Sequence, residues 1–162
     1  MSQAVIALGS NIGNTLLNLK EAVALLEEYG CVVLAKSQLY QTEPWGFKEQ
    51  SDFLNGAVLV ETIAEPKGLL DITQGIEKKM GRSKEFINGP RNIDLDILLY
   101  DEIEIISDDL TIPHARLHQR LFVLQPMADV APNWRVGNLG TVANILANYQ
   151  GNERVELTDL QL

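Results

Sequence analysis

The chain has 162 residues with a balanced share of hydrophobic and charged residues, which predicts one soluble globular domain spanning residues 1–162. Its formal net charge of -9 argues against a nucleic-acid-binding protein, because such a protein needs a basic face. No apolar stretch approaches the ~20 residues that cross a bilayer, and the N-terminus lacks a signal-peptide pattern, so we expect a cytoplasmic protein with no membrane partner. Cys31 is the single cysteine, which excludes an internal disulfide.

Strands and helices alternate along the first part of the chain. Short apolar runs predict the strands, and apolar residues at helical spacing predict the helices. The expected elements are a strand at 4–8, a helix at 15–29, strands at 31–40 and 53–62, a helix at 66–80, and a strand that carries Asp94 and Asp96. This order predicts an α+β fold with a ferredoxin-like βαββαβ core, in which both helices cover one face of an antiparallel sheet.

Shorter elements are expected after this core. Strands are predicted at 103–106 and 110–112, and helices at 121–130 and 142–149. Residues 150–162 allow either a final strand or a frayed end.

Two aspartates lie in a strand that should otherwise be apolar. Because alternate side chains of a strand share a face, Asp94 and Asp96 are expected on one face. The opposite face would carry Ile93, Leu95, Ile97 and Leu99. Two neighbouring carboxylates share a proton or recruit a cation, and Mg²⁺ is the natural candidate. The same Asp-x-Asp pattern also occurs in solvated strands, and this interpretation stays open on the pair alone.

Basic residues come directly before the aspartate pair. They are Lys78, Lys79, Arg82, Lys84 and Arg91, against the single acid Glu85 between residues 78 and 91. Arginine and lysine beside a metal site are typical of polyphosphate binding, whereas charge patterning alone would equally fit a solvated basic loop.

Several short motifs resemble one enzyme family. They are ALGSN at 7–11, FLNGA at 53–57, GR at 81–82, GPRNIDLD at 89–96 and PHARLHQRLF at 113–122. In this order and spacing the sequence is similar to the 6-hydroxymethyl-7,8-dihydropterin pyrophosphokinases of folate biosynthesis, over about residues 4 to 132. The resemblance implies a monomeric, ferredoxin-like enzyme that moves the β,γ-diphosphate of ATP onto the pterin hydroxymethyl group and releases AMP.

The resemblance also implies a site for ATP and magnesium. Asp94 and Asp96 match the ligands of two Mg²⁺ ions, and Arg82 and Arg91 match arginines that neutralise the polyphosphate; these four are the expected catalytic residues. Six further positions match residues around the nucleotide or its phosphates: Leu70, Gln74, Ile97, Thr111, His114 and Arg120.

The expected pterin site lies at other positions of the motifs. Phe53 and Phe122 match a stacking pair, and Asn55 matches the residue that reads the ring edge together with backbone near Thr42. A flat polar heterocycle needs such aromatic faces and amide groups. Gly9 is expected to allow close approach of the ligand, and Trp45 lies in the first of two expected lid loops, 43–51 and 82–90. Departures from the family pattern are Asn88, Asp109 and Ala115.

Two other functions fit part of the sequence. A ferredoxin-like ligand-binding module without catalysis would explain the fold but not the aspartate pair and the arginines. A metal-dependent phosphohydrolase would use Asp94 and Asp96 equally well, with water in place of a pterin alcohol.

Overall fold

The structure, a computed structural model, describes residues 1–81 and 91–162. Its elements in chain order are β1 (Ser2–Ser10), α1 (Thr15–Glu28), β2 (Val32–Lys36), β3 (Tyr40–Thr42), β4 (Phe53–Thr62), α2 (Pro66–Lys79), β5 (Asp94–Tyr100), β6 (Ile105–Ile106), β7 (Thr111–Ile112), a 3-10 turn at Leu117–Gln119, α3 (Leu121–Val130), a second 3-10 turn at Gly137–Leu139, α4 (Val142–Ala147) and β8 (Val155–Leu157). No helix within these described ranges has the length and apolar character needed to cross a membrane.

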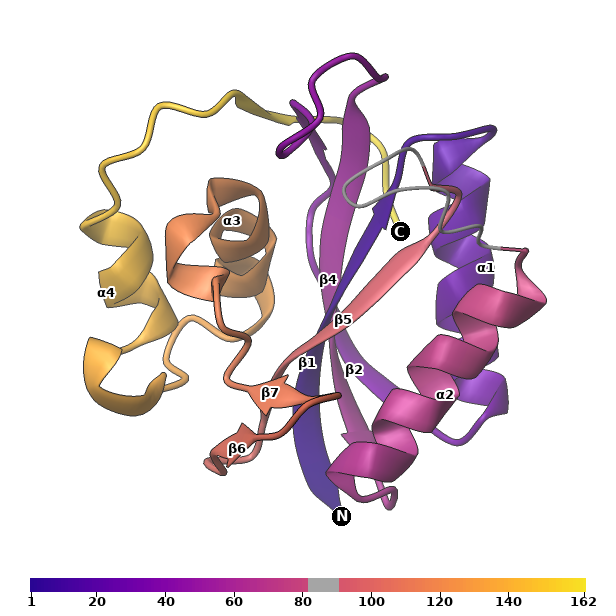
Figure 1. Ribbon diagram of the computed structural model, residues 1–162, viewed down its shortest axis with the longest axis vertical. Coiled ribbons are helices and arrows are strands. Elements are labelled where there is room, and N and C mark those ends of the chain that lie inside the picture. The colour runs from indigo at the N-terminus through magenta and orange to yellow at the C-terminus, as the bar shows by residue number, and fades with distance from the viewer. Residues whose placement is uncertain (82–90) are drawn as a thin grey trace.

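The main sheet is antiparallel and confirms the predicted ferredoxin-like core. Its order is β5-β1-β4-β3-β8, and β2 also pairs with β4. Helices α1 and α2 cover one face, whereas α3 covers the other and α4 packs on the outer side of α3 (Figure 1). The sheet is therefore enclosed between two helical layers, and the second layer comes from the segment after the βαββαβ core.

Helix α1 begins and ends where the sequence predicts. The Asn14 side chain accepts a hydrogen bond from the backbone N–H of Leu17 at 3.1 Å, and Gly30 follows the helix with φ +95°. Leu19 and Leu26 face the sheet and are fully buried. In α2, Leu69 and Ile76 also face the sheet and are fully buried, which confirms the predicted apolar face of this helix.

Alternate side chains of β1 pack into two separate hydrophobic cores. Ala4, Ile6 and Leu8 pack with α1 and α2, while Val5 packs with residues of α3 such as Leu124. All of these side chains are nearly or completely excluded from solvent, so β1 is buried against helices on both of its faces.

One prediction for β5 is wrong. Leu99 was expected on the same face as Leu95 and Ile97, but it packs in the other core, with Val5. The register moves from Val5↔Leu99 to Ile6↔Ile97, so Leu98 is an extra residue that shifts the alternation. The Leu98 carbonyl then accepts a hydrogen bond from the backbone N–H of His114 at 3.0 Å, which fixes the segment carrying that histidine.

The predicted strand at 31–40 is two strands. At the break, the Ser37 hydroxyl donates to the Gln38 carbonyl and accepts from the Ala57 N–H at 2.8 Å. Leu39 is fully buried beside Gly56, where a Cβ would lie 2.7 Å from Leu39 Cδ2. After the break, β3 pairs Thr42 with Phe53, and this pairing brings two expected pterin residues together.

Of the later elements, α3 has the predicted bounds, and the others are shorter than predicted. The expected strand at 103–106 is reduced to β6, and the expected helix at 142–149 ends at residue 147. Residues 155–157 form β8 on the outer edge of β3, so the strand alternative for the tail is the correct one in this part.

Candidate active site

A cavity of about 460 Å³ opens at the end of the sheet where β1 and β3 finish and β4 begins. It is lined by Gly9, Thr42, Glu43, Trp45, Phe53, Asn55, Arg91, Asp94, Asp96, Arg120 and Phe122. The expected pterin residues all belong to this set, although they come from three strands, a loop and α3. The fold therefore brings them into one wall, which we call the aromatic cavity.

A buried amide forms the floor of the aromatic cavity. Asn55 is 8% exposed, and its side-chain N–H donates to the Thr42 hydroxyl at 2.6 Å. A Cβ added to Gly9 would lie 2.7 Å from Asn55 Oδ1. Glycine at position 9 thus leaves room for the Asn55 amide, whereas the expected close approach of a ligand to Gly9 stays a prediction.

Two arginines lie over the rings of the aromatic cavity. The Arg120 guanidinium is 5.0 Å from the Trp45 ring centroid and 5.8 Å from that of Phe122, and Arg91 is 5.8 Å from that of Phe53. Such distances permit cation–π attraction. Burial, followed by the neighbouring Arg116, lowers the pKa of Arg120, while the Asp96 carboxylate opposes that shift. The arginine is still a cation at neutral pH.

A larger groove of about 910 Å³ lies on the other side of the aspartate pair. It is lined by Leu70, Gln74, Glu77, Asp94, Leu95, Asp96, Ile97, Ser107, Asp108, Asp109, Leu110, Thr111, His114 and Ala115. Five of the expected nucleotide residues line it, namely Leu70, Gln74, Ile97, Thr111 and His114. Arg91 and Arg120 belong to the wall of the aromatic cavity instead. We call this second space the acidic groove.

Carboxylates dominate the acidic groove. Asp94, Asp96, Glu77, Asp108 and Asp109 line it, and no lysine or arginine of residues 1–81 and 91–162 does. A polyanion placed there would lie against several carboxylates, and cations bound with it would reduce the repulsion. The lining is therefore suited to a ligand that carries its own metal ions.

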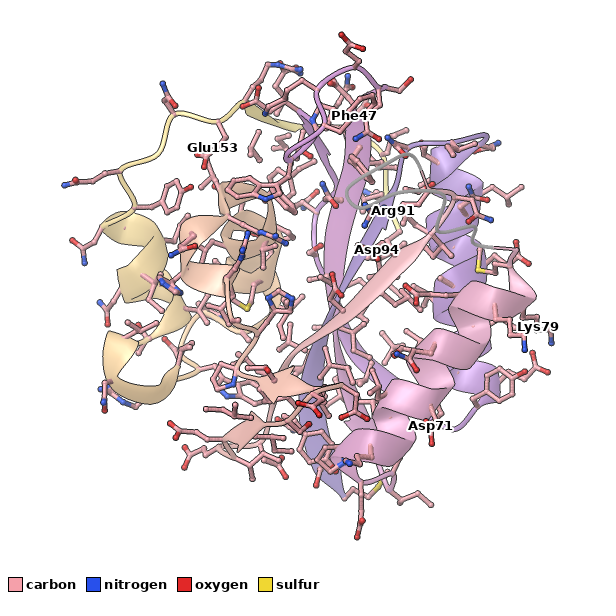
Figure 2. The ribbon with its side chains drawn as sticks, viewed as in Figure 1. Phe47, Asp71, Lys79, Arg91, Asp94 and Glu153 are labelled. Atoms are coloured by element: carbon pink, nitrogen blue, oxygen red, sulfur yellow. The ribbon has the colours of Figure 1, made fainter. Side chains whose placement is uncertain are left out.

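Asp94 and Asp96 are shared by the two spaces. Asp94 and Arg91 lie next to each other at the start of β5 (Figure 2). Asp94 Oδ2 is 3.2 Å from Arg91 Nη1, and the side chains of Asp94 and Arg91 are 24% and 16% exposed. Within the described ranges, no group of three or more histidine, cysteine or acidic side chains could hold a metal ion. Two carboxylates fit Mg²⁺ as part of its shell, with phosphate oxygens and water as the remaining ligands.

Glu77 is a buried member of the groove that the sequence interpretation missed. Its side chain accepts a hydrogen bond from the backbone N–H of Leu95, between the two aspartates, at 2.9 Å. The signal was present, because Glu77 follows Leu69, Thr73 and Ile76 on the inner stripe of α2. A carboxylate on such a stripe is unusual and points to a specific role.

His114 stands in the groove with a lowered pKa. Burial is the main cause, and the nearby Arg120 cation adds to it, while Asp94 acts in the opposite direction. Nδ1 accepts a hydrogen bond from the backbone N–H of Arg116 at 3.3 Å. The imidazole is accordingly neutral at neutral pH.

Part of the expected site lies outside the described residues. This applies to Arg82 and to the whole expected lid at 82–90, including Asn88. The first expected lid, 43–51, is described, and its Trp45 ring lies 6.2 Å from the Phe122 ring, centroid to centroid.

Comparison with known proteins adds a family to this geometry. The family model of 7,8-dihydro-6-hydroxymethylpterin-pyrophosphokinase matches residues 5–132. A Bacillus subtilis protein named 2-amino-4-hydroxy-6-hydroxymethyldihydropteridine pyrophosphokinase is 47% identical over 128 residues, which are 78% of this chain and 77% of that protein. A Methylorubrum extorquens protein of the same name is 42% identical over 159 residues, which are 96% of this chain and all of the relative.

Solved structures agree on the fold. A triple mutant of Plasmodium falciparum HPPK-DHPS superposes with a TM-score of 0.76 at 18% identity and covers 91% of this chain. The match takes up 43% of the Plasmodium chain, so this protein spans less than half of that relative. The extent of the family match and the identity to the two bacterial proteins lead to one conclusion. The chain belongs to the 7,8-dihydro-6-hydroxymethylpterin-pyrophosphokinase family.

Proposed function

We propose that the chain transfers the β,γ-diphosphate of ATP to the hydroxymethyl group of 6-hydroxymethyl-7,8-dihydropterin, giving the pterin diphosphate and AMP. Pyrophosphokinase activity, a diphosphotransferase reaction of folate biosynthesis that uses ATP, is the activity of the family to which the chain belongs. The observation that carries the proposal is the meeting of the aromatic cavity and the acidic groove at Asp94 and Asp96.

The aromatic cavity suits the pterin. Phe53 and Phe122 supply faces for a flat heterocycle, and the Asn55 amide can pair with its polar edge. The Trp45 ring, which now lies against Phe122 and Arg120, has to move or share this space when the pterin enters. A pterin bound here would hold its hydroxymethyl group toward the aspartate pair.

The acidic groove suits ATP accompanied by magnesium. Leu70 and Ile97 offer apolar contact for the adenine, and Gln74 and Thr111 offer hydrogen bonds. The phosphates would then extend toward Asp94 and Asp96, the two residues that would hold the two Mg²⁺ ions. When bound, these ions would neutralise phosphate charge and lower the pKa of the attacking hydroxyl.

The protein's own residues align the reaction and stabilise its charge. In the proposed step the pterin hydroxyl oxygen forms a bond to the β-phosphorus and loses its proton to solvent. The bond from that phosphorus to the α,β-bridging oxygen breaks, so AMP leaves. Arg91 and Arg120 lie beside the aspartate pair and can stabilise charge on the transferred group. Arg82, by resemblance, shares this task. The 43–51 loop would limit the access of water, the competing acceptor.

We also propose that the protein acts as a monomeric single domain in the cytoplasm, without a nucleic-acid or membrane partner. The net charge of -9 and the resemblance to monomeric enzymes support this. A sedimentation experiment at micromolar concentration would find a species of 18.0 kDa. A stable dimer would contradict the monomer.

The proposed reaction is tested by nucleotide analysis after the protein is mixed with ATP and Mg²⁺, with and without 6-hydroxymethyl-7,8-dihydropterin. We expect AMP to form only when the pterin is present. Release of ADP or phosphate without pterin would favour a metal-dependent phosphohydrolase. Binding of either compound with no turnover would favour a non-catalytic ligand-binding module.

A further inference from the structure

The C-terminal segment contacts Glu43, which lines the aromatic cavity, and Gln119, which precedes the lining residue Arg120, although the family match ends at residue 132. From α4 the chain crosses one end of the molecule and joins the sheet beside β3 as β8 (Figure 1). Glu153 in this segment and Phe47 in the loop between β3 and β4 lie at the same end of the molecule (Figure 2). The tail is therefore in a position to act on the cavity.

Arg154 makes the contacts that matter most. Its guanidinium holds the Asp52 carboxylate through two hydrogen bonds, Nη1 to Oδ2 at 2.9 Å and Nη2 to Oδ1 at 3.0 Å. Its backbone N–H donates to Glu43 Oε1 at 3.2 Å, and its carbonyl accepts from the Glu43 N–H at 3.3 Å. One tail residue thus binds Glu43 and Asp52 together.

Glu43 and Asp52 are the two ends of a loop, 43–52, that forms part of the cavity wall. Glu43 follows Thr42, the last residue of β3, and Asp52 precedes Phe53, the first residue of β4. Trp45, which packs on Arg120 and Phe122, lies inside this loop. A contact that fixes both ends limits the paths that the loop can take, and therefore the positions open to the Trp45 ring.

The ion pair has the geometry of a specific contact. Two parallel hydrogen bonds between guanidinium and carboxylate fix the orientation of both groups. Arg154, followed by the Gln41 amide, lowers the pKa of Asp52, so the carboxylate is ionised throughout the neutral range. The side chains are 44% and 26% exposed, which leaves the pair accessible to salt.

The tail also lies next to the turn that precedes Arg120, a residue of the opposite wall. The Tyr149 hydroxyl is 3.0 Å from the Gln119 carbonyl oxygen and also lies within hydrogen-bond distance of the Glu153 carboxylate, and its single proton is donated to one of these two acceptors at a time. Glu153 is the neighbour of Arg154 in sequence. The segment 149–154 thereby connects the start of α3 to the 43–52 loop.

We propose that Arg154 is a positioning residue of the aromatic cavity, which joins the two ends of the 43–52 loop and so sets the Trp45 ring against Arg120 and Phe122. The identity of the ligand as a pterin rests on the proposed function, whereas the effect on the loop does not. Arg154 touches no reacting atom in this account, so its loss should change binding of one substrate and leave the chemical step intact.

The first test follows the loop itself. In a Trp134→Phe background, Trp45 is the remaining tryptophan, and acrylamide quenching of its emission reports its exposure. We expect Arg154→Met to raise the quenching constant ~2-fold, because the loop opens locally. Arg135→Met, which removes an exposed arginine distant from the loop contacts, is the matched control and should leave it unchanged. Equal quenching in the two variants would overturn the proposal.

The second test measures pterin binding. Arg154→Met should raise the KM for 6-hydroxymethyl-7,8-dihydropterin ~3-fold, as expected for loss of an exposed ion pair, with kcat and the KM for ATP unchanged. Arg154→Lys, which keeps the charge but not the two-point geometry, should fall between wild type and Arg154→Met. Asp52→Asn should add nothing further in the Arg154→Met background. Additive effects, or a fall in kcat alone, would contradict a positioning role.

The two tests separate this inference from the proposed function. If the wild-type protein makes no AMP but the quenching difference is found, the reaction is wrong and the loop contact stands. If the wild-type protein makes AMP and neither quenching nor the KM for pterin responds to Arg154→Met, the reaction stands and the role of Arg154 is wrong.

Discussion

The aromatic cavity and the acidic groove share Asp94 and Asp96 but are otherwise opposite in chemistry. The cavity has rings, a buried amide and two arginines, whereas the groove has carboxylates and, in the described part of the chain, no lysine or arginine. Under the proposed function, the arginines of the cavity would lie beside the pterin and the transferred diphosphate. The carboxylates of the groove would repel the phosphates of ATP less if Mg²⁺ were bound with them, which favours the proposal that ATP binds together with magnesium.

Removal of a shared aspartate should disable both spaces and give the largest effect. We expect Asp96→Asn to lower kcat for AMP formation ~10³-fold or more, because charge on the phosphates is no longer stabilised there. Chelation of magnesium should reduce the wild-type rate by a similar factor.

The control for Asp96→Asn is Asp108→Asn, which makes the same charge change in an exposed part of the groove. It should change kcat less than ~3-fold, as is usual for an exposed charge. Circular dichroism should find both variants folded, and relief of like-charge repulsion should leave Asp96→Asn at least as stable as wild type without metal. Turnover close to wild type in Asp96→Asn would refute the metal assignment.

A substitution in the aromatic cavity should change the KM for the pterin alone, and one in the acidic groove should change the KM for ATP alone. Phe122→Leu keeps apolar volume but removes the ring face, so the KM for the pterin should rise ~10-fold while the KM for ATP stays constant. Gln74→Ala should do the reverse, raising the KM for ATP ~5-fold through one lost hydrogen bond. Steady-state kinetics with each substrate varied in turn would measure both. If either variant changed both KM values equally, the pterin and ATP would not bind in separate spaces.

Gly9→Ala tests the floor of the aromatic cavity. The added Cβ would lie 2.7 Å from Asn55 Oδ1, while the hydrogen bond to Thr42 holds that amide in place. We expect a ~5-fold increase in the KM for the pterin and little change for ATP, because the displaced amide loses a hydrogen bond to the ring. Unchanged pterin binding would show that Asn55 does not read the ring edge.

The pH dependence of stability should report on the groove. His114 has a folded-state pKa below its ordinary value of 6.5, so the unfolded chain takes up a proton first as the pH falls. The contribution of neutral His114 to the free energy of unfolding is complete above its ordinary pKa of 6.5 and is lost as the pH falls below that value. Urea unfolding should therefore show a steeper loss of stability between pH 7 and pH 5 in wild type than in His114→Gln. Parallel curves would mean that His114 is not held neutral by its surroundings.

Most of the core could be predicted because local pattern and tertiary structure agree there. The stripe of α1 and the cap at Asn14 were visible in sequence, as was the order of strands and helices. The face of Leu99 could not be predicted, because the bulge at Leu98 depends on pairing with β1, which is separated from it in the sequence.

The candidate site also combines residues that local sequence predicts with residues that only the fold brings together. Asp94 and Asp96 follow from strand alternation, but the residues of the aromatic cavity were identified by resemblance, since Phe53 and Phe122 read alone would fit an ordinary core. The contact of Arg154 with Asp52 joins residues 102 positions apart, and no local sequence pattern indicates it. Glu77 was the exception, because its place on the inner stripe of α2 could have revealed it.

A crystal structure with Mg²⁺, 6-hydroxymethyl-7,8-dihydropterin and an ATP analogue with a methylene group between the α- and β-phosphorus atoms tests the shared aspartate pair most directly. Such an analogue cannot undergo the proposed bond cleavage. We expect the pterin between Phe53 and Phe122, adenine in the acidic groove, and metal ions on Asp94 and Asp96 between the two ligands. Adenine in the aromatic cavity, or phosphates bound away from the aspartates, would contradict this expectation.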